Sequence, residues 1–237
     1  MTIDAILASL FPGGHDVGRA DGLLMGSGRM EDGGAVTVIG VIDHTALGVD
    51  EALALSAHVL GSGTGPILVL VDSASQRMSK RDELLGLNEF LAHLAKCLVV
   101  ADLNGRLTVG LLYGRSAAGA FIATALATRV LVALPGAEPT VMDLPSMARV
   151  TKLSLETLEA KAKSTPVFAP GLDNLAAMGA VHEMWDPHLP LSAQLATLLA
   201  RGTDTTDRRG RLGAERAGRP KAAAIAERVH ALALEDD

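Results

Sequence analysis

The sequence predicts an α/β protein with parallel strand pairing, and three observations support this. Runs of β-branched apolar residues alternate with segments whose apolar residues recur every three or four positions. The chain has 237 residues, of which 49% are hydrophobic, enough for a single globular domain over 1–237 with a sizeable core. Strands that alternate with helices favour parallel pairing, because each helix returns the chain to start a new strand.

The first elements of the expected core are two buried strands with a helix between them. Residues 35–42 (AVTVIGVI) are almost entirely apolar, which predicts a strand buried on both faces. Asp50 can cap a helix over 51–60, because its side chain can accept from an N–H of the first turn. Pro66 then precedes a second buried strand over 67–71.

A polar loop and further strand–helix pairs follow. The loop is expected over 72–80, and leucines spaced by three or four positions predict one long helix over 82–101. A third strand over 107–113 is predicted to turn directly into a small-residue helix over 117–127. A fourth strand is predicted at 129–134.

The rest of the chain is predicted to be mainly helical. Short strands are expected at 140–142 and 180–184, with a loop at 166–170 between them. Arginine and glycine dominate 201–219, so we predict a mobile, exposed connection there. It leads to a final helix within 220–237.

Composition and charge argue against several function classes. The 27 acidic and 21 basic side chains give a net charge of −6, which argues against nucleic-acid binding. The single Cys97 cannot form an internal disulfide and favours a reducing compartment. There is no signal-peptide layout and no apolar run of ~20 residues, so we expect a cytoplasmic protein with no membrane partner. Seven scattered histidines lack the spacing of ligands, and no metal is expected.

Residues 113–121 (YGRSAAGAF) form the first candidate site. The first N–H groups of a helix have no partner within the helix. Ala118 and Gly119 lie in that first turn, where their amides could hold a developing oxyanion. A tightly packed crossover is the structural alternative. Residues 114–118 also nearly match the G-x-S-x-G nucleophile motif, which would need an acid and a histidine downstream.

The polar loop over 72–80 is the second candidate site. It follows the carboxyl end of a buried strand, where α/β proteins collect their ligand contacts. The amides of Ser73 and Ala74 could supply a second donor, while Gln76 and Arg77 could contact a carboxylate or an acyl carrier. A solvated loop is the structural alternative.

Three ordered motifs, at 71–86, 113–121 and 131–143, together resemble a carboxyltransferase domain of the crotonase-like superfamily. The resemblance is strongest to the gamma subunit of biotin-independent malonate decarboxylase and covers a core over 32–185. It implies a crotonase-like spiral of ββα units with peripheral helices, paired with a homologous beta subunit so that the active site lies between them. It also implies that a malonyl thioester, carried on the prosthetic group of an acyl carrier protein, is decarboxylated to an acetyl thioester and CO₂. No biotin and no directly bound cofactor are implied.

The resemblance also implies roles for particular residues. Oxyanion donors are placed at a helix start, here Ala118 and Gly119, and in a loop after a strand, here Ser73 or Ala74. Biotin-dependent relatives usually have Gly-Gly at the first position and a Pro-Gly-containing loop at the second. Those departures fit a member that works without biotin.

The enolate must then take a proton, and several groups could supply it. Tyr113, Ser116, an ordered water and an acid of the beta subunit are the candidates. Substrate contacts are expected from Gln76, Arg77, Gly114, Arg115 and Met142.

Two other functions are consistent with the residues. A self-sufficient crotonase-like hydratase or hydrolase of coenzyme A esters would turn over as an isolated chain, although neither candidate loop carries a carboxylate aligned as a base. A non-catalytic scaffold would only complete a partner's site. Substituting Gly119 would separate the scaffold from a catalytic subunit.

Overall fold

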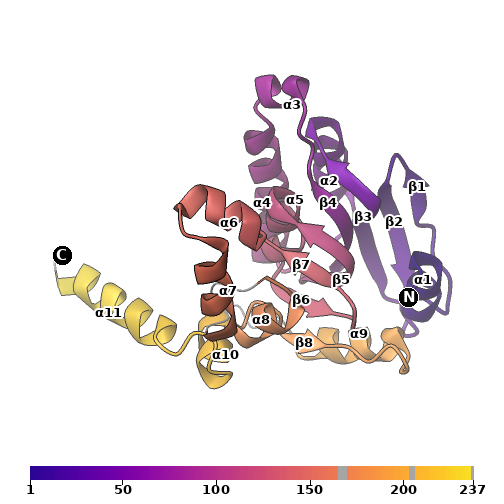
Figure 1. The fold of residues 1–237 in the computed structure, drawn as a ribbon. Helices are drawn as coiled ribbons and strands as arrows, with labels where there is room; N and C mark the ends of the chain where they lie inside the picture. The colour runs from indigo at the N-terminus through magenta and orange to yellow at the C-terminus, as the bar shows by residue number, and fades with distance from the viewer. Residues whose placement is uncertain (165–169, 203–205, 236–237) are drawn as a thin grey trace. The chain divides into compact units, whose positions relative to one another are not determined.

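A computed structural model describes residues 1–164, 170–202 and 206–235 (Figure 1). The chain divides into two compact units, one of Met1–Val141 with Glu183–Thr205 and one of Met142–His182 with Thr206–Asp237. This division is finer than the single domain that the length predicts. The predicted core over 32–185 contributes to both units.

The first unit is built on a sheet that has eight strands among the described residues (Figure 1). Its order is β1-β2-β3-β4-β5-β6-β8, and β7 pairs with β5. Two pairs of neighbouring strands in the described sheet, β1 with β2 and β2 with β3, are antiparallel. The other described pairs are parallel, which confirms the predicted α/β class. The strands are β1 Gly18–Ala20, β2 Leu23–Arg29, β3 Ala35–Leu47, β4 Ile67–Gln76, β5 Thr108–Ala117, β6 Val130–Ala133, β7 Glu138–Thr140 and β8 Glu183–Met184.

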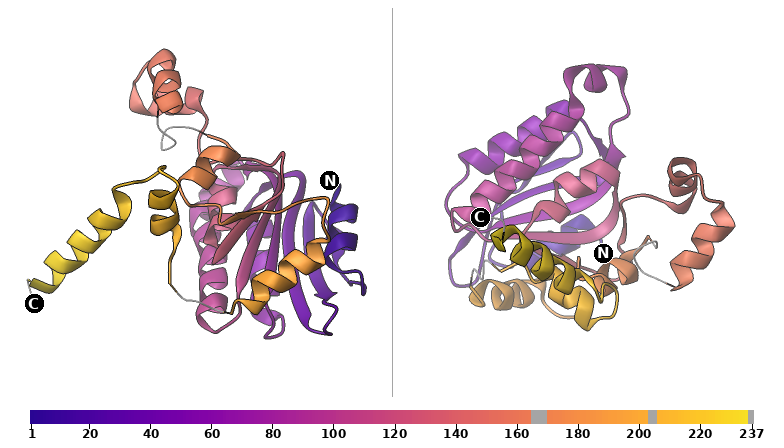
Figure 2. Two further views of the ribbon diagram at one scale, coloured as in Figure 1. Left: turned by 90° about the horizontal axis from the view of Figure 1, so that it is seen from below. Right: turned by 90° about the vertical axis from the view of Figure 1, so that its left-hand side faces the viewer.

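Helices cover both faces of this sheet (Figure 2). On one face α1 and α9 pack together on a core that includes apolar residues of β3, β4 and β5. On the other face α2 and α5 each contact α4, and all three helices contact the strands. The helices of this unit are α1 Ile3–Leu10, α2 Val49–Gly61, α3 Lys80–Leu85, α4 Leu87–Leu103, α5 Ala118–Ala123, the 3₁₀ turn η1 Ala125–Ala127 and α9 Leu191–Ala200.

The predicted buried strands lie at the centre of this arrangement. Residues 67–71 of β4 are all fully buried between the two helical layers. This explains why their sequence lacks the polar alternation of a half-exposed strand. The elements before residue 30, namely α1, β1 and β2, had no counterpart in the prediction.

Two strands extend further than the sequence predicts. β4 continues to Gln76, through part of the predicted polar loop, because Ser73 and Gln76 pair with β3. β5 continues to Ala117, four residues beyond the predicted end at 113, and then turns directly into α5 at Ala118, as predicted. The cause of the extension is β7, which pairs with Arg115–Ala117 from a distant part of the chain.

Other boundaries differ for local reasons. The long helix predicted over 82–101 is two helices, α3 and α4, because Gly86 adopts a left-handed conformation (φ +84°) between them. The helix predicted over 117–127 is the short α5 followed by η1. The strand predicted at 140–142 lies two residues earlier, as β7, and the strand predicted at 180–184 is reduced to the two residues of β8.

The regular secondary structure in the described residues of the second unit is all helical. It consists of α6 Leu144–Thr151, α7 Leu155–Ser164, α8 Leu172–Ala177, α10 Arg209–Glu215 and α11 Ala222–Glu235. Within the stretch predicted as a mobile connection, residues 209–215 form α10, and Arg216 donates to the carbonyls of Ala176, Val181 and His182. Residues 203–205 of that stretch, 166–169 of the predicted loop and 236–237 of the final helix lie outside the described residues.

Within residues 1–164, 170–202 and 206–235, no helix combines the length and the hydropathy that a membrane span requires.

Candidate functional site

The parallel ladder is interrupted at the carboxyl ends of β3, β4 and β5. Between two aligned rows, residues 42–44 of β3 and residues 113–115 of β5 face the single residue Asp72 of β4. The row before the interruption is Val41–Val71–Leu112, and the row after it is Thr45–Ser73–Ser116. Such bulges redirect side chains and are common beside functional sites.

Asp72 bridges the interruption on both sides. Its Oδ1 accepts from the backbone N–H of Arg115 on β5 at 2.9 Å, and it lies 2.9 Å from Nδ1 of His44 on β3. The carboxylate is largely buried, with 13% of the side chain exposed. A Cβ at position 114 would overlap the Asp72 carboxylate, which explains the glycine there. The Asp72 side chain thus accepts from a backbone N–H of β5 that lies within the bulge, between the aligned rows of the ladder.

The backbone is strained at the same place. Asp43 and His44 both have positive φ, at 56° and 54°. Left-handed geometry costs about 1–2 kcal/mol for each non-glycine residue. Strain of this kind persists where the surroundings impose it, and it clusters at functional sites.

Buried hydroxyls lie beyond the interruption. Ser73 and Ser116 face each other across β4 and β5, are fully buried, and have hydroxyls without a hydrogen-bond partner in the described residues. The hydroxyl of Thr140 on β7 is in the same state. An unpaired buried polar group costs about 1–3 kcal/mol, so native structures keep few of them. Ser116 lies inside a strand and not on the exposed turn of a nucleophile motif.

The predicted helix-start donor contacts a predicted substrate residue. The N–H of Gly119 donates to Oε1 of Gln76 at 2.9 Å. Ala118, the first residue of α5, has φ +49°, a conformation that favours glycine. A Cβ on Gly119 would lie 3.1 Å from the same Gln76 oxygen. The amide therefore holds an oxygen acceptor, and this acceptor is a side chain of the chain itself.

Arg77 takes part in an internal ion-pair network. It pairs with Glu51 at the start of α2, and its Nη1 lies 3.8 Å from the buried Asp82 of α3. The hydrogen bond to Glu51 is the largest cause that raises the pKa of Arg77. The guanidinium thus fixes the chain after β4 against two helices.

Tyr113 is a poor acid in this setting. Burial, followed by the charges of Asp72 and Asp43, raises the pKa of its phenol. A phenol in this state keeps its proton and serves as a hydrogen-bond donor.

The structure brings most predicted site residues to one end of the sheet. Ser73, Ala74 and Gln76 belong to the end of β4, residues 113–117 to the end of β5, and residues 118–119 to α5. The exposed Arg115 side chain lies 3.7 Å from Glu138 of β7. Met142 belongs to the second unit.

Sequence reasoning missed the pair of His44 and Asp72. A detectable signal was present, because Asp72 directly follows one run that predicts a buried strand and His44 lies two residues after the end of another. Their contact depends on the two bulges, which the pattern of apolar residues does not encode.

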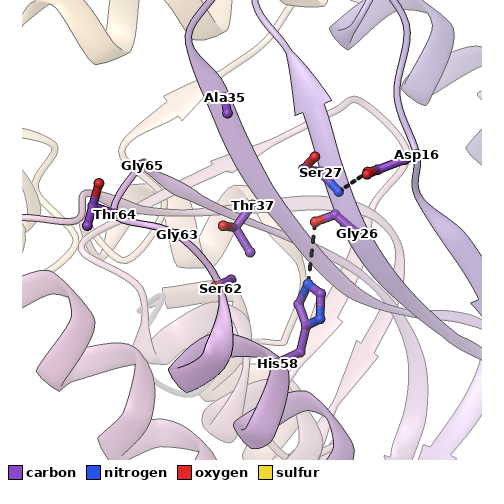
Figure 3. Close-up of a pocket in the computed structure, with 10 residues that line it drawn as sticks. All are labelled: Asp16, Gly26, Ser27, Ala35, Thr37, His58, Ser62, Gly63, Thr64 and Gly65. Carbon is purple, nitrogen blue, oxygen red and sulfur yellow. Dashed lines mark hydrogen bonds between the residues drawn. The ribbon is translucent and has the colours of Figure 1, made fainter.

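A separate cavity of about 560 Å³ lies at the opposite, amino-terminal end of the parallel strands (Figure 3). Its polar groups are used within the protein: Nε2 of His58 is 3.4 Å from the carbonyl of Gly26, and Asp16 accepts from the N–H of Ser27. The hydroxyls of Thr37 and Ser62 accept from Arg106. The glycine-rich loop after α2 lines this cavity, and α2 ends at its first glycine, Gly61.

The fold is that of the crotonase-like carboxyltransferases. The transcarboxylase 12S core superposes with a TM-score of 0.67 at 18% identity over 84% of this chain and 40% of that chain. The beta subunit of geranyl-CoA carboxylase from P. aeruginosa gives 0.65 at 18% identity over 93% and 43%. The implied crotonase-like fold is confirmed.

The chain belongs to the malonate decarboxylase gamma subunit family, whose sequence profile matches residues 42–233. A subunit of the Pseudomonas malonate decarboxylase hetero-tetramer superposes with a TM-score of 0.75 at 27% identity, covering 98% of each chain. The MdcD–MdcE hetero-dimer of Pseudomonas gives 0.73 at 25% identity over 95% and 96%.

A curated relative is the malonyl-S-ACP:biotin-protein carboxyltransferase MADD of Malonomonas rubra. It is 31% identical over 142 residues, which are 59% of this chain and 49% of the relative. The match thus covers about half of that relative's length.

Proposed function

We propose that this chain is the gamma subunit of a cytoplasmic decarboxylase that acts with a homologous beta subunit. The substrate is a malonyl thioester on an acyl carrier protein, and the products are the acetyl thioester and CO₂. The observation that carries this proposal is the family match over residues 42–233. The isolated chain is expected to be inactive, because the active site is shared with the beta subunit.

Stabilisation of an enolate is the chemistry that the site suits best. Loss of CO₂ leaves negative charge on the thioester oxygen, and preorganised N–H donors lower the barrier to its formation. Gly119 supports this role because its amide already holds an oxygen at 2.9 Å. We infer that the thioester oxygen takes the place of Gln76 Oε1 when substrate binds, with Ser73 or Ala74 as the second donor.

The remaining predicted residues keep the roles that their positions allow. Gln76, Gly114 and Arg115 would line the substrate path, and Arg77 would act by fixing the chain after β4. The prosthetic group of the carrier protein would deliver the thioester, and the reaction would need no biotin.

A non-catalytic scaffold is the second candidate, and the contact between Gly119 and Gln76 favours it. If that hydrogen bond persists when substrate binds, the N–H of Gly119 is occupied by Gln76 and cannot donate to an oxyanion. The chain would then only complete a site in the beta subunit.

Co-expression with the beta subunit tests the proposal. The purified complex and each separate subunit are assayed for acetyl thioester and CO₂ formation from malonyl-acyl carrier protein. Activity in the complex alone is the expected result. Turnover of a coenzyme A ester by the isolated chain would instead support a self-sufficient crotonase-like enzyme and overturn the proposal.

A further inference from the structure

His44 and Asp72 form a pair of titratable side chains that have no role in the oxyanion chemistry of Gly119 and the loop donors. Nδ1 of His44 lies 2.9 Å from Oδ1 of Asp72. The carboxylate is 13% exposed, whereas the imidazole is 57% exposed. A carboxylate that accepts from Nδ1–H sets the tautomer and orientation of a histidine and leaves Nε2 for proton transfer.

The surrounding strands hold this pair in place. The oxygen that faces His44 also accepts from the N–H of Arg115, so the carboxylate is fixed from both neighbouring strands. His44 adopts its left-handed conformation directly before Thr45, which pairs with Ser73. The imidazole is therefore one residue from the row that contains the predicted loop donor.

We propose that His44 is the catalytic acid that protonates the carbanion left by decarboxylation, and that Asp72 is the positioning residue that orients it; this inference rests on the proposed function. Decarboxylation breaks the bond between Cα and the carboxylate carbon and leaves the electron pair on the thioester enolate. That pair forms a C–H bond with the Nε2 proton of the imidazolium as the N–H bond breaks. Water then returns a proton to His44, so each turnover consumes one proton from solvent.

His44 fits this role better than the donors expected from the sequence. Ser116 is fully buried. Burial and two nearby carboxylates raise the pKa of Tyr113, so its phenol releases a proton less readily. His44 combines an exposed ring with a fixed carboxylate partner, the arrangement that general acids use.

The test uses the complex with the beta subunit and the variants His44→Asn and Asp72→Asn. Asparagine tolerates a left-handed backbone and so matches the conformation of His44. Each complex is assayed for decarboxylation and for exchange of the α-hydrogens of acetyl-acyl carrier protein with D₂O. Exchange is the reverse of the protonation step and does not require CO₂ release. His58→Asn, at the other end of the sheet, is the matched control.

We expect His44→Asn to lower kcat and the exchange rate by about 10²-fold or more, with KM unchanged. Added imidazole should restore part of the exchange, which a purely structural role would not allow. Asp72→Asn should lower kcat without changing KM, and His58→Asn should leave both rates unchanged. If His44→Asn fails to assemble, His44→Gln replaces it.

The possible failures are distinguishable. Exchange by the His44 variant at the wild-type rate would overturn the assignment of His44, while the proposed function would stand. A wild-type complex that releases no CO₂ from malonyl-acyl carrier protein would overturn the proposed function, and the assignment of His44 would fall with it.

Discussion

The two ends of the parallel strands differ in whether their buried polar groups are hydrogen-bonded. At the amino-terminal end, Arg106 donates to the carbonyls of Val59 and Gly65 and to the hydroxyls of Thr37 and Ser62. At the carboxyl-terminal end the described structure has unpaired buried hydroxyls and residues with positive φ. These residues are Ser73, Ser116, Asp43, His44 and Ala118.

This difference shows how one sheet can separate stability from function. Hydrogen bonds at the amino-terminal end stabilise the strand register. The unpaired hydroxyls and the positive φ angles at the carboxyl-terminal end lower the stability of the fold. Natural proteins break local rules of this kind mainly at functional sites. The comparison therefore predicts that substitutions at the two ends affect different measurements.

The largest expected effect is on activity, from Gly119→Val at the carboxyl-terminal end. A Cβ would already lie 3.1 Å from Gln76 and 3.3 Å from Leu91, so the valine methyl groups would block the approach to the amide. Loss of one oxyanion donor lowers kcat by about 10²–10³-fold. The assay is decarboxylation by the assembled complex, with circular dichroism as the check of folding. Unchanged activity in a folded complex would remove the catalytic role of this crossover and favour the scaffold.

A smaller effect, on stability, is expected from Arg106→Ala at the amino-terminal end. The substitution removes four hydrogen bonds from a guanidinium and leaves their acceptors to find water. We expect the free energy of unfolding to fall by about 3 kcal/mol. Arg19→Ala, which breaks an exposed ion pair with Asp4, is the control and should cost less than about 1 kcal/mol.

Urea denaturation measures both variants, and decarboxylation by the folded complexes should stay at the wild-type rate. A loss of activity in folded Arg106→Ala complexes would contradict the separation of the two ends.

Apolar patterns in the sequence were enough to predict the parallel core. The strand over 67–71 was found because its burial on both faces requires a continuous apolar run. The extension of β5 was not found, because it depends on β7, more than twenty residues further along the chain. Pairing partners of this kind follow from tertiary structure and leave no local period.

The candidate site was predicted in its parts but not in its connections. Gly119 and Gln76 were singled out separately, yet their hydrogen bond joins residues 43 positions apart. The contact of Asp72 with His44 requires a bulge on each neighbouring strand. A bulge inserts extra residues into one strand of a pair, and the pattern of apolar residues does not show where this happens. Sequence patterns thus located the right end of the sheet but not its geometry.

The smallest expected effect, and the most direct comparison, uses two residues of β5. Thr108 lies at its amino-terminal end, fully buried, and its hydroxyl accepts from the N–H of Arg129 at 2.8 Å. Ser116 lies at its carboxyl-terminal end, equally buried, with an unpaired hydroxyl. Thr108→Val leaves the half-buried N–H of Arg129 without this acceptor and should destabilise the protein by about 1–2 kcal/mol.

Ser116→Ala removes an unsatisfied group, so the free energy of unfolding should stay the same or rise by up to about 1 kcal/mol. Chemical denaturation of the two variants side by side measures the contrast within a single strand. Equal destabilisation by both substitutions would mean that Ser116 has a partner in the folded protein, and the difference between the two ends would then rest on backbone strain alone. A stable Ser116→Ala complex with lowered kcat would instead indicate that the hydroxyl is kept unpaired for the substrate.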